Sequence, residues 1–372
     1  MEQRREQLDG LRALVFFCVF AVHHFFVPLE FLSYALPVFF AMSGFLITRV
    51  LWQSQAPTLG EKLKTFYVRR ILRICPAYYV VLLFLFLFHD LQYPLANVFY
   101  LLNLKIFALS LDPYNPEFVN LAASWDKHDL HLWSMSVEEQ YYILYPLLFY
   151  IVPRRRMNLL FGATVLVAIA TRTWLMHVAP ESFFGFLLPS CMEYFAWGGL
   201  FAFLMLEGKL PSRRSTWWAV YLPAAAVAVS IAIEYGFKLD GYYMCQTTHF
   251  TSFVAPMLGL LIWGLWTESP SHPAIRFMNL RPLVYLGKIG YAMYLVHLST
   301  WDLYRAWCAP LINGYVVDPT WQTVWFIAVT FALTVAFGAA LWHFVEVPAG
   351  KLKKYFPVAG PKPVATLLPA ER

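Results

Sequence analysis

Residues 8–23 read Leu8-Asp9-Gly10-Leu11-Arg12-Ala13-Leu14-Val15-Phe16-Phe17-Cys18-Val19-Phe20-Ala21-Val22-His23, and this stretch decides the class of fold. The ten residues between Arg12 and His23 are all apolar. A helix that crosses the ~30 Å apolar layer of a bilayer needs about 20 mostly apolar residues. The stretch starts like a signal peptide but has no small-residue cleavage site, so we expect an uncleaved first span.

The rest of the chain repeats this pattern. Of the 372 residues, 60% are apolar and 13% are charged, whereas a typical soluble domain has roughly a quarter charged residues. This composition excludes a disordered chain and predicts an all-α integral membrane protein, a bundle of about ten transmembrane helices. The predicted spans are 10–28, 34–52, 74–92, 131–152, 157–177, 183–206, 217–235, 249–267, 283–308 and 320–345. Residues 95–109 are apolar but short, which predicts an interfacial or re-entrant helix.

The basic residues predict the orientation of these spans. With the N-terminus inside, the predicted inner segments contain 20 of the 28 Lys and Arg residues, and the outer segments contain only Lys105, Lys127 and Lys238. Because Lys and Arg collect in cytoplasmic loops, both termini are expected in the cytoplasm. The same distribution explains the net charge of +6 without a nucleic-acid partner. We expect one membrane domain at 1–350 and a short cytoplasmic tail at 351–372, loose after Ala359.

The first predicted span contains two ionisable residues on one face. Arg12 and His23 are eleven residues apart, which is three helical turns, so His23 lies about 16 Å deeper. His24 lies about 120° away from Arg12 and is off this face. An ionisable group inside a span is a functional hypothesis by default. The structural alternative is a histidine bonded to a neighbouring helix and an arginine reaching the inner headgroups. Asp9 is placed to cap this helix.

A second basic group follows the second span. Thr58 and Glu61 match a capping box that opens a helix to about residue 74, lying at the inner membrane surface. Arg69 falls off its apolar face, whereas Arg70 lies inside that face with Arg73 one turn on. Two inward guanidiniums suit a polyanion such as a nucleotide or coenzyme A. The alternative is an ordinary anchor to lipid headgroups.

The fourth predicted span enters with Ser134 and Glu138 one helical turn apart. Glu138 lies roughly 10 Å deep and His23 roughly 7–8 Å deep from the outer side. An imidazole–carboxylate pair between these helices would raise the basicity of His23, as a general base requires. The alternative is a carboxylate hydrated at the interface, which we prefer for Glu139. The five cysteines are scattered without CxxC spacing and predict free buried thiols rather than a metal site.

Six ordered motifs give the chain a specific resemblance. They are Leu8-Asp9-Gly10-Leu11-Arg12-Ala13 to His23, Val38-Phe39-Phe40-Ala41-Met42-Ser43-Gly44-Phe45-Leu46-Ile47, Arg69-Arg70-Ile71-Leu72-Arg73, His131-Leu132-Trp133-Ser134 to Tyr142, Tyr291-Ala292-Met293-Tyr294-Leu295-Val296-His297, and Glu346-Val347-Pro348. Over about residues 5–350 the chain resembles the membrane-bound acyltransferase-3 family of bacterial surface glycans and secondary metabolites. Many relatives have Asp before the Phe-Phe pair, whereas this chain has Val38. Longer relatives carry a C-terminal esterase-like domain, so any extracytoplasmic acyl-accepting partner is expected to be a separate protein.

The resemblance implies a membrane O-acyltransferase of the bacterial inner membrane. It would move an acyl group, expected to be acetyl, from cytoplasmic acyl-CoA to a hydroxyl of a carbohydrate or polysaccharide acceptor, with no metal. It implies His23 as the catalytic base. The other implied catalytic-site residues are Arg12, Ser134 and Glu138; the donor-binding residues are Arg69, Arg70 and Arg73; the substrate-binding residues are Trp133 and His297. Direct transfer and an acyl-enzyme intermediate both stay open. The alternative function is a transporter that uses the same polar residues without chemistry, although inverted repeats are not evident.

Overall fold

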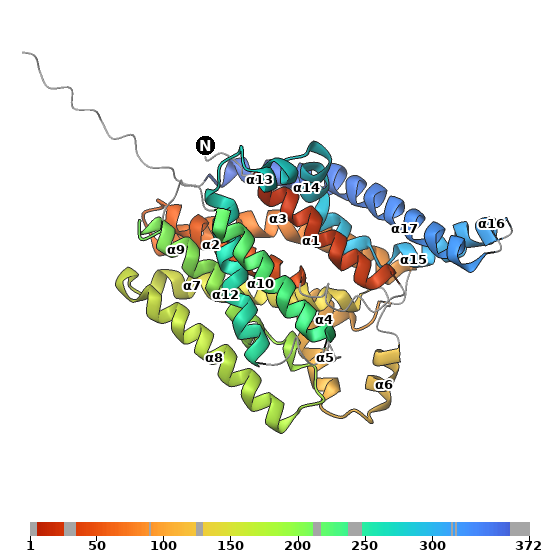
Figure 1. The fold of residues 1–372 in the computed structure, drawn as a ribbon, viewed down its shortest axis with the longest axis horizontal. Coiled ribbons are helices and arrows are strands. Elements are labelled where there is room, and N and C mark those ends of the chain that lie inside the picture. The colour runs from red at the N-terminus through yellow and green to blue at the C-terminus, as the bar shows by residue number, and fades with distance from the viewer. Residues whose placement is uncertain are drawn as a thin grey trace, which may run out of the picture.

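The computed structural model describes residues 6–25, 35–88, 91–123, 129–210, 217–236, 248–313, 315–316 and 318–357. Within these ranges the regular elements are all helices and no strand occurs, which confirms the predicted all-α class (Figure 1). The longer helices are α1 (Glu6–His24), α2 (Ala35–Gln53), α3 (Leu59–Phe88), α7 (Trp133–Ile151), α8 (Met157–Val178), α9 (Leu188–Leu206), α10 (Trp217–Gly236), α12 (Thr248–Thr267), α14 (Arg281–Val296) and α17 (Pro319–Leu341).

Shorter helices connect these long ones. They are α4 (Pro94–Val98), α5 (Leu102–Ser110), α6 (Pro116–Ala123), α13 (Pro273–Met278), α15 (Thr300–Leu303), α16 (Ala309–Asn313) and α18 (Val347–Lys351). The predicted interfacial segment 95–109 is thus two short helices, α4 and α5. The last two predicted spans contain π-helical turns, at Tyr304–Cys308 and Trp342–Glu346.

The predicted surface helix and the third span are one element. The predicted boundary between them lies near residue 74, but α3 runs without interruption through Pro76. Its start is as predicted, because the backbone N–H of Thr58 donates to Glu61 and the N–H of Glu61 donates back to the Thr58 hydroxyl, both at 3.2 Å. The continuous helix carries the arginines of 69–73 directly into the bundle.

Close backbone contacts hold the central helices together. Helix α2 packs along α9, and α1 packs along α14. A Cβ atom added at Gly44 would lie 2.1 Å from the carbonyl oxygen of Phe195, so only glycine permits this approach of α2 to α9. A Cβ at Gly287 would lie 1.7 Å from the carbonyl oxygen of Asp9. This second contact brings the start of α14 against the polar end of α1.

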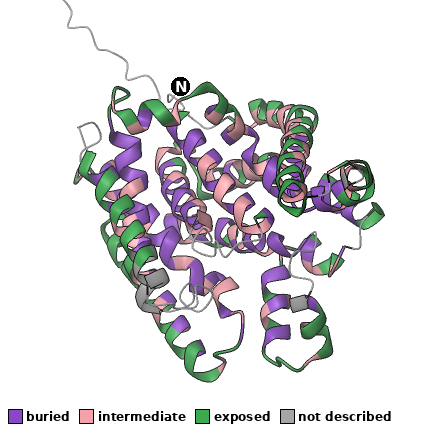
Figure 2. Ribbon diagram, turned by 45° about the vertical axis from the view of Figure 1, so that its right-hand side comes forward, coloured by how far each residue is buried: buried purple, intermediate pink, exposed green. Residues whose placement is uncertain are grey.

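The outer surfaces of the bundle are apolar. Among the described residues, four helical segments are long and apolar enough to cross a membrane: Ala35–Gln53, Leu59–Phe88, Arg154–Val178 and Pro319–Tyr355. Only 22% of the apolar window of Arg154–Val178 is buried by the protein. Figure 2 shows exposed residues on the outward faces of the peripheral helices and buried residues between helices. Such apolar faces indicate contact with lipid.

Candidate active site

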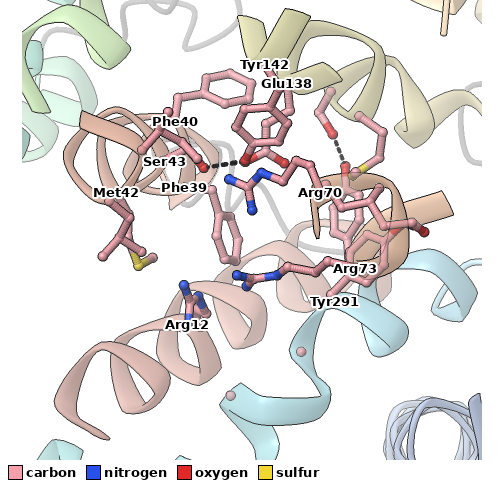
Figure 3. A pocket seen from close by; sticks show the side chains of 18 of the residues that line it. Arg12, Phe39, Phe40, Met42, Ser43, Arg70, Arg73, Glu138, Tyr142 and Tyr291 are labelled. Atoms are coloured by element: carbon pink, nitrogen blue, oxygen red, sulfur yellow. Dashed lines mark hydrogen bonds between the residues drawn. The ribbon is translucent and has the colours of Figure 1, made fainter. Parts of the chain in front are cut away.

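A cavity at the centre of the bundle collects most of the predicted site residues. This central cavity has a volume of ≈ 190 Å³ and lies between α1, α2, α3, α7, α14 and Glu346. Its polar lining comes from residues far apart in the sequence: Asp9, Arg12, Ser43, Arg70, Arg73, Ser134, Glu138, Tyr142, Lys288, Tyr291, Tyr294 and Glu346. Arg12, Arg70, Arg73, Ser134 and Glu138 are therefore brought together in one lining. Figure 3 shows Arg12, Arg70, Arg73 and Glu138 around this space.

Arg12 is held by the carboxylate of Asp9. Its Nη1 donates to Asp9 Oδ1 over 2.7 Å, and the Asp9 side chain is 2% exposed. The expectation that Asp9 caps the helix is wrong, because α1 already begins at Glu6 and Asp9 lies in its first turns. Asp9 therefore pairs with Arg12, three residues further along the same helix face, instead of capping the helix. Arg12 keeps 20% of its side chain exposed, on the cavity side.

Arg70 and Arg73 enter the same space from α3. The guanidinium carbon of Arg70 lies 3.9 Å from the ring centre of Tyr142, a cation–π contact. Arg73 is exposed, and it lines the central cavity. Figure 3 shows the guanidiniums of Arg12, Arg70 and Arg73 converging beside Phe39. Three positive groups this close repel one another, and a bound anion would relieve that repulsion.

Arg69 has a different setting from its neighbours. Its Nη1 donates to the carbonyl oxygens of Lys353 and Phe356, over 3.2 and 2.9 Å. The first residues of the segment predicted as a tail are therefore helical and bound to α3. Residues 358–372 lie outside the described residues. Arg69 stabilises the C-terminal contact and stays off the central cavity.

The carboxylate of Glu138 is bonded to two hydroxyl groups that belong to the quoted motifs but were not predicted as site residues. Ser43 Oγ from α2 and Tyr142 Oη from α7 both donate to Glu138 Oε1, and the two hydroxyl oxygens are 2.9 Å apart (Figure 3). The predicted pair of His23 with Glu138 is not formed within the described residues. The spacing of Glu138 and Tyr142, four residues on one helix, was a signal available in the sequence.

Ser134 is linked to α14 by a short network. Its hydroxyl lies 2.5 Å from the Tyr294 hydroxyl, which in turn donates to the His131 carbonyl over 2.8 Å. The backbone carbonyl of Tyr294 accepts from His131 Nε2 at 3.0 Å and from His297 Nδ1 at 2.7 Å. Tyr294 therefore connects the central cavity with a group of histidines.

Four histidine rings gather beyond this network. The ring centre of His297 lies 5.4 Å from His23, 6.1 Å from His24 and 4.7 Å from His131. His24 is buried and stacks on Phe20, whereas His23 is partly exposed. His23 and His297 lie beside the central cavity rather than in its lining.

Other predicted residues lie elsewhere or are not described. The ring of Trp133 stacks on Phe186 with centres 3.9 Å apart, and Trp133 lies outside the lining of the central cavity. One carboxylate oxygen of Glu139 is buried rather than hydrated, which corrects our expectation for that residue. Cys18, Cys75, Cys191 and Cys308 are free thiols, and Cys245 lies outside the described residues.

The chain was compared with known protein families and curated proteins. Residues 5–343 match the family model described as an acyltransferase domain. The chain is 23% identical over 373 residues to the peptidoglycan O-acetyltransferase OatA of Listeria monocytogenes, covering 92% of this chain and 55% of that protein. It is 24% identical over 365 residues to the O-acetyltransferase OatA of Staphylococcus aureus, covering 92% and 57%.

These curated relatives are longer, and the chain spans little more than half of their length. No solved structure matches the chain. The family match covers nearly all of the described helices and every residue that lines the central cavity except Glu346. The chain belongs to the acyltransferase-domain family.

Proposed function

We propose that the protein is a bacterial inner-membrane O-acetyltransferase with ten spans and both termini in the cytoplasm. It would move an acetyl group from cytoplasmic acetyl-CoA to a hydroxyl group of a carbohydrate of the cell surface. The observation that carries the proposal is the central cavity, where Arg12, Arg70 and Arg73 share one space with Glu138 and Ser134. The names of the relatives support a glycan acceptor.

The arginines suit the donor end of the reaction. Coenzyme A carries a diphosphate, and guanidiniums bind phosphate oxygens through paired N–H groups. With the predicted topology, Arg12, Arg70 and Arg73 are on the cytoplasmic side of Ser134 and the histidines. A donor entering from the cytoplasm would leave its phosphates at the arginines and extend its thioester towards α7.

The histidines suit the acceptor end. His23 would take the proton of the acceptor hydroxyl while the acyl group passes from sulfur to oxygen, and coenzyme A would leave as the thiol. His297 donates through Nδ1 to a carbonyl oxygen, so its neutral ring has its lone pair on Nε2. We infer that this imidazole orients His23, with which its ring is in contact. Glu138, Ser43 and Tyr142 would stabilise the polar acceptor in the cavity.

The test is release of the coenzyme A thiol by the purified protein, with acetyl-CoA and a panel of glycans that includes peptidoglycan fragments. His23→Ala is expected to lower the rate at least about 100-fold, because general-base catalysis contributes about that much. His177→Ala is the matched control, since His177 is exposed at the far end of α8. Equal rates for wild type and His23→Ala across the panel would show that His23 is not the catalytic base. A transporter would bind the donor and release no thiol.

A further inference from the structure

Two more cavities adjoin the central one at Arg73. The first, the basic cavity, has a volume of ≈ 410 Å³ and lies beside the ends of α1, α2 and α14. The second, the α3 cavity, has a volume of ≈ 180 Å³ and lies between α2 and the start of α3. Arg73 lines all three. A ligand at Arg73 therefore has three adjacent spaces around it.

The basic cavity has more positive than negative side chains. Its basic residues are Arg12, Arg49, Arg73, Lys288 and Lys353, and its acidic residues are Asp9 and Glu346. Asp9 is bonded to Arg12, and Arg73, Lys288 and Lys353 share the cavity with one further carboxylate, that of Glu346. Three cations around one carboxylate leave an excess of positive charge that a bound anion would offset.

Several of these cationic side chains have donors available for such an anion. Within the described residues, the ammonium groups of Lys288 and Lys353 and the guanidinium of Arg73 have no hydrogen bond or ion pair. Lys353 takes part in hydrogen bonding through its backbone carbonyl, which accepts from Arg69. One oxygen of Glu346 is buried without a hydrogen-bond partner. Arg73, Lys288 and Lys353 are thus not taken up by hydrogen bonds or ion pairs among the described residues.

Aromatic walls complete the basic cavity. Trp266 and Trp342 line it, and the guanidinium carbon of Arg49 lies 3.5 Å from the ring centre of Trp266. A guanidinium stacked on a ring still presents its N–H groups at the edge, where they can bind phosphate. A purine base stacks well on an indole. Phosphate-binding cations next to indoles are the features that recognise a phosphorylated nucleoside.

We propose that the basic cavity binds the 3′-phosphorylated adenosine end of the acyl-CoA donor, through Lys288 and Lys353. This rests on the proposed function and assigns residues to the donor beyond the arginines of α3. The α3 cavity is less than half as large, so the nucleotide occupies the basic cavity. The diphosphate then lies at Arg73, where the cavities meet, and the pantetheine arm enters the central cavity.

The experiment compares acetyl-CoA with acetyl-3′-dephospho-CoA, which lacks only the phosphate that the basic cavity would bind. Lys353→Gln is expected to raise KM for acetyl-CoA about tenfold with kcat unchanged, the loss expected for one charge-assisted contact. The same variant is expected to leave KM for the dephospho donor unchanged. Lys351→Gln is the control: Lys351 carries the same charge two residues away, is exposed and lines none of the three cavities.

Two kinetic results would overturn the proposal. An equal rise in KM for both donors would mean that Lys353 acts on another part of the donor or on the fold. No rise for either donor would mean that the basic cavity does not contact the nucleotide. Lys288→Gln provides a second variant from a different helix, so that misfolding of one variant does not decide the outcome.

Direct binding separates this proposal from the proposed function. Calorimetry with coenzyme A and 3′-dephospho-CoA, without acceptor, is run in nanodiscs of phosphatidylcholine with and without phosphatidylglycerol. Tighter binding of coenzyme A that Lys353→Gln abolishes supports the subsite even if no acetyl transfer is found. If phosphatidylglycerol abolishes that difference between the two ligands, the site binds lipid headgroups and the proposal is wrong.

Discussion

Glu138 is the residue whose partners define the polar centre of the cavity. Its Oε1 accepts from both Ser43 and Tyr142, so three side chains from two helices act as one hydrogen-bonded group. Removing its charge changes the electrostatics of the whole cavity, whereas removing one donor leaves the other.

We predict that Glu138→Gln lowers kcat about 100-fold and that Tyr142→Phe lowers it about tenfold, in the range found for single polar groups in active sites. Initial rates of thiol release at saturating acetyl-CoA measure both. Tyr145→Phe serves as the control, because Tyr145 lies one turn further along α7 and bonds to Thr48 outside the central cavity. A larger loss in Tyr142→Phe than in Glu138→Gln would contradict a leading role for the carboxylate.

His297 offers a second prediction at this scale. Its Nδ1 bonds to the Tyr294 carbonyl, and its buried Nε2 has no hydrogen-bond partner within the described residues. Glutamine can still donate a hydrogen bond but cannot accept a proton. We expect His297→Gln to lower kcat at least tenfold while the protein remains folded, with a shifted pH–rate profile. An unchanged profile with full activity would restrict His297 to packing.

At the scale of elements, one buried ion pair joins three helices. Arg172 on α8 is bonded to Glu193 on α9, and both side chains are 1% exposed. Arg172 also donates to the Ser190 carbonyl at 2.6 Å, and Ser252 on α12 donates to Glu193 at 3.1 Å. The pair lies away from all three cavities, so it stabilises the packing of α8, α9 and α12.

We therefore expect Arg172→Leu to destabilise the protein by about 3–5 kcal/mol, because it leaves a buried carboxylate without its counter-charge. The double variant Arg172→Leu/Glu193→Leu is expected to recover most of this loss. Thermal unfolding in detergent, followed by tryptophan fluorescence, measures both variants. If the double variant is as unstable as the single one, the hydrogen bonds to Ser190 and Ser252 dominate over the ion pair.

At the scale of the whole molecule, the proposed topology puts the three cavities near the cytoplasm and the histidines towards the outside. In a variant without native cysteines, Tyr114→Cys and Lys351→Cys report on the two sides, and both positions are exposed. We expect a membrane-impermeant maleimide to label Tyr114→Cys in intact spheroplasts and Lys351→Cys only after lysis. Labelling of both in intact spheroplasts would contradict the topology, because it would place both positions outside.

The sequence by itself determined the class of protein and the candidate site residues. Apolar runs of about 20 residues predict helices wherever they occur, and a period of 3.6 residues places Arg12 with His23, and Ser134 with Glu138, on shared faces. These are local properties of one helix. The same helical period singled out Arg70 and Arg73 on the apolar face of their helix, and the structure places both in the central cavity.

Only the tertiary structure decided which faces meet. Glu138 on α7 bonds to Ser43 on α2, and no local pattern specifies that these two helices lie side by side. Asp9 pairs with Arg12 instead of capping a helix because α1 begins earlier than its apolar run. The basic cavity combines α1, α2, α12, α14 and the C-terminal segment. Its charge excess comes from side chains hundreds of residues apart, so it exists only once the helices have packed.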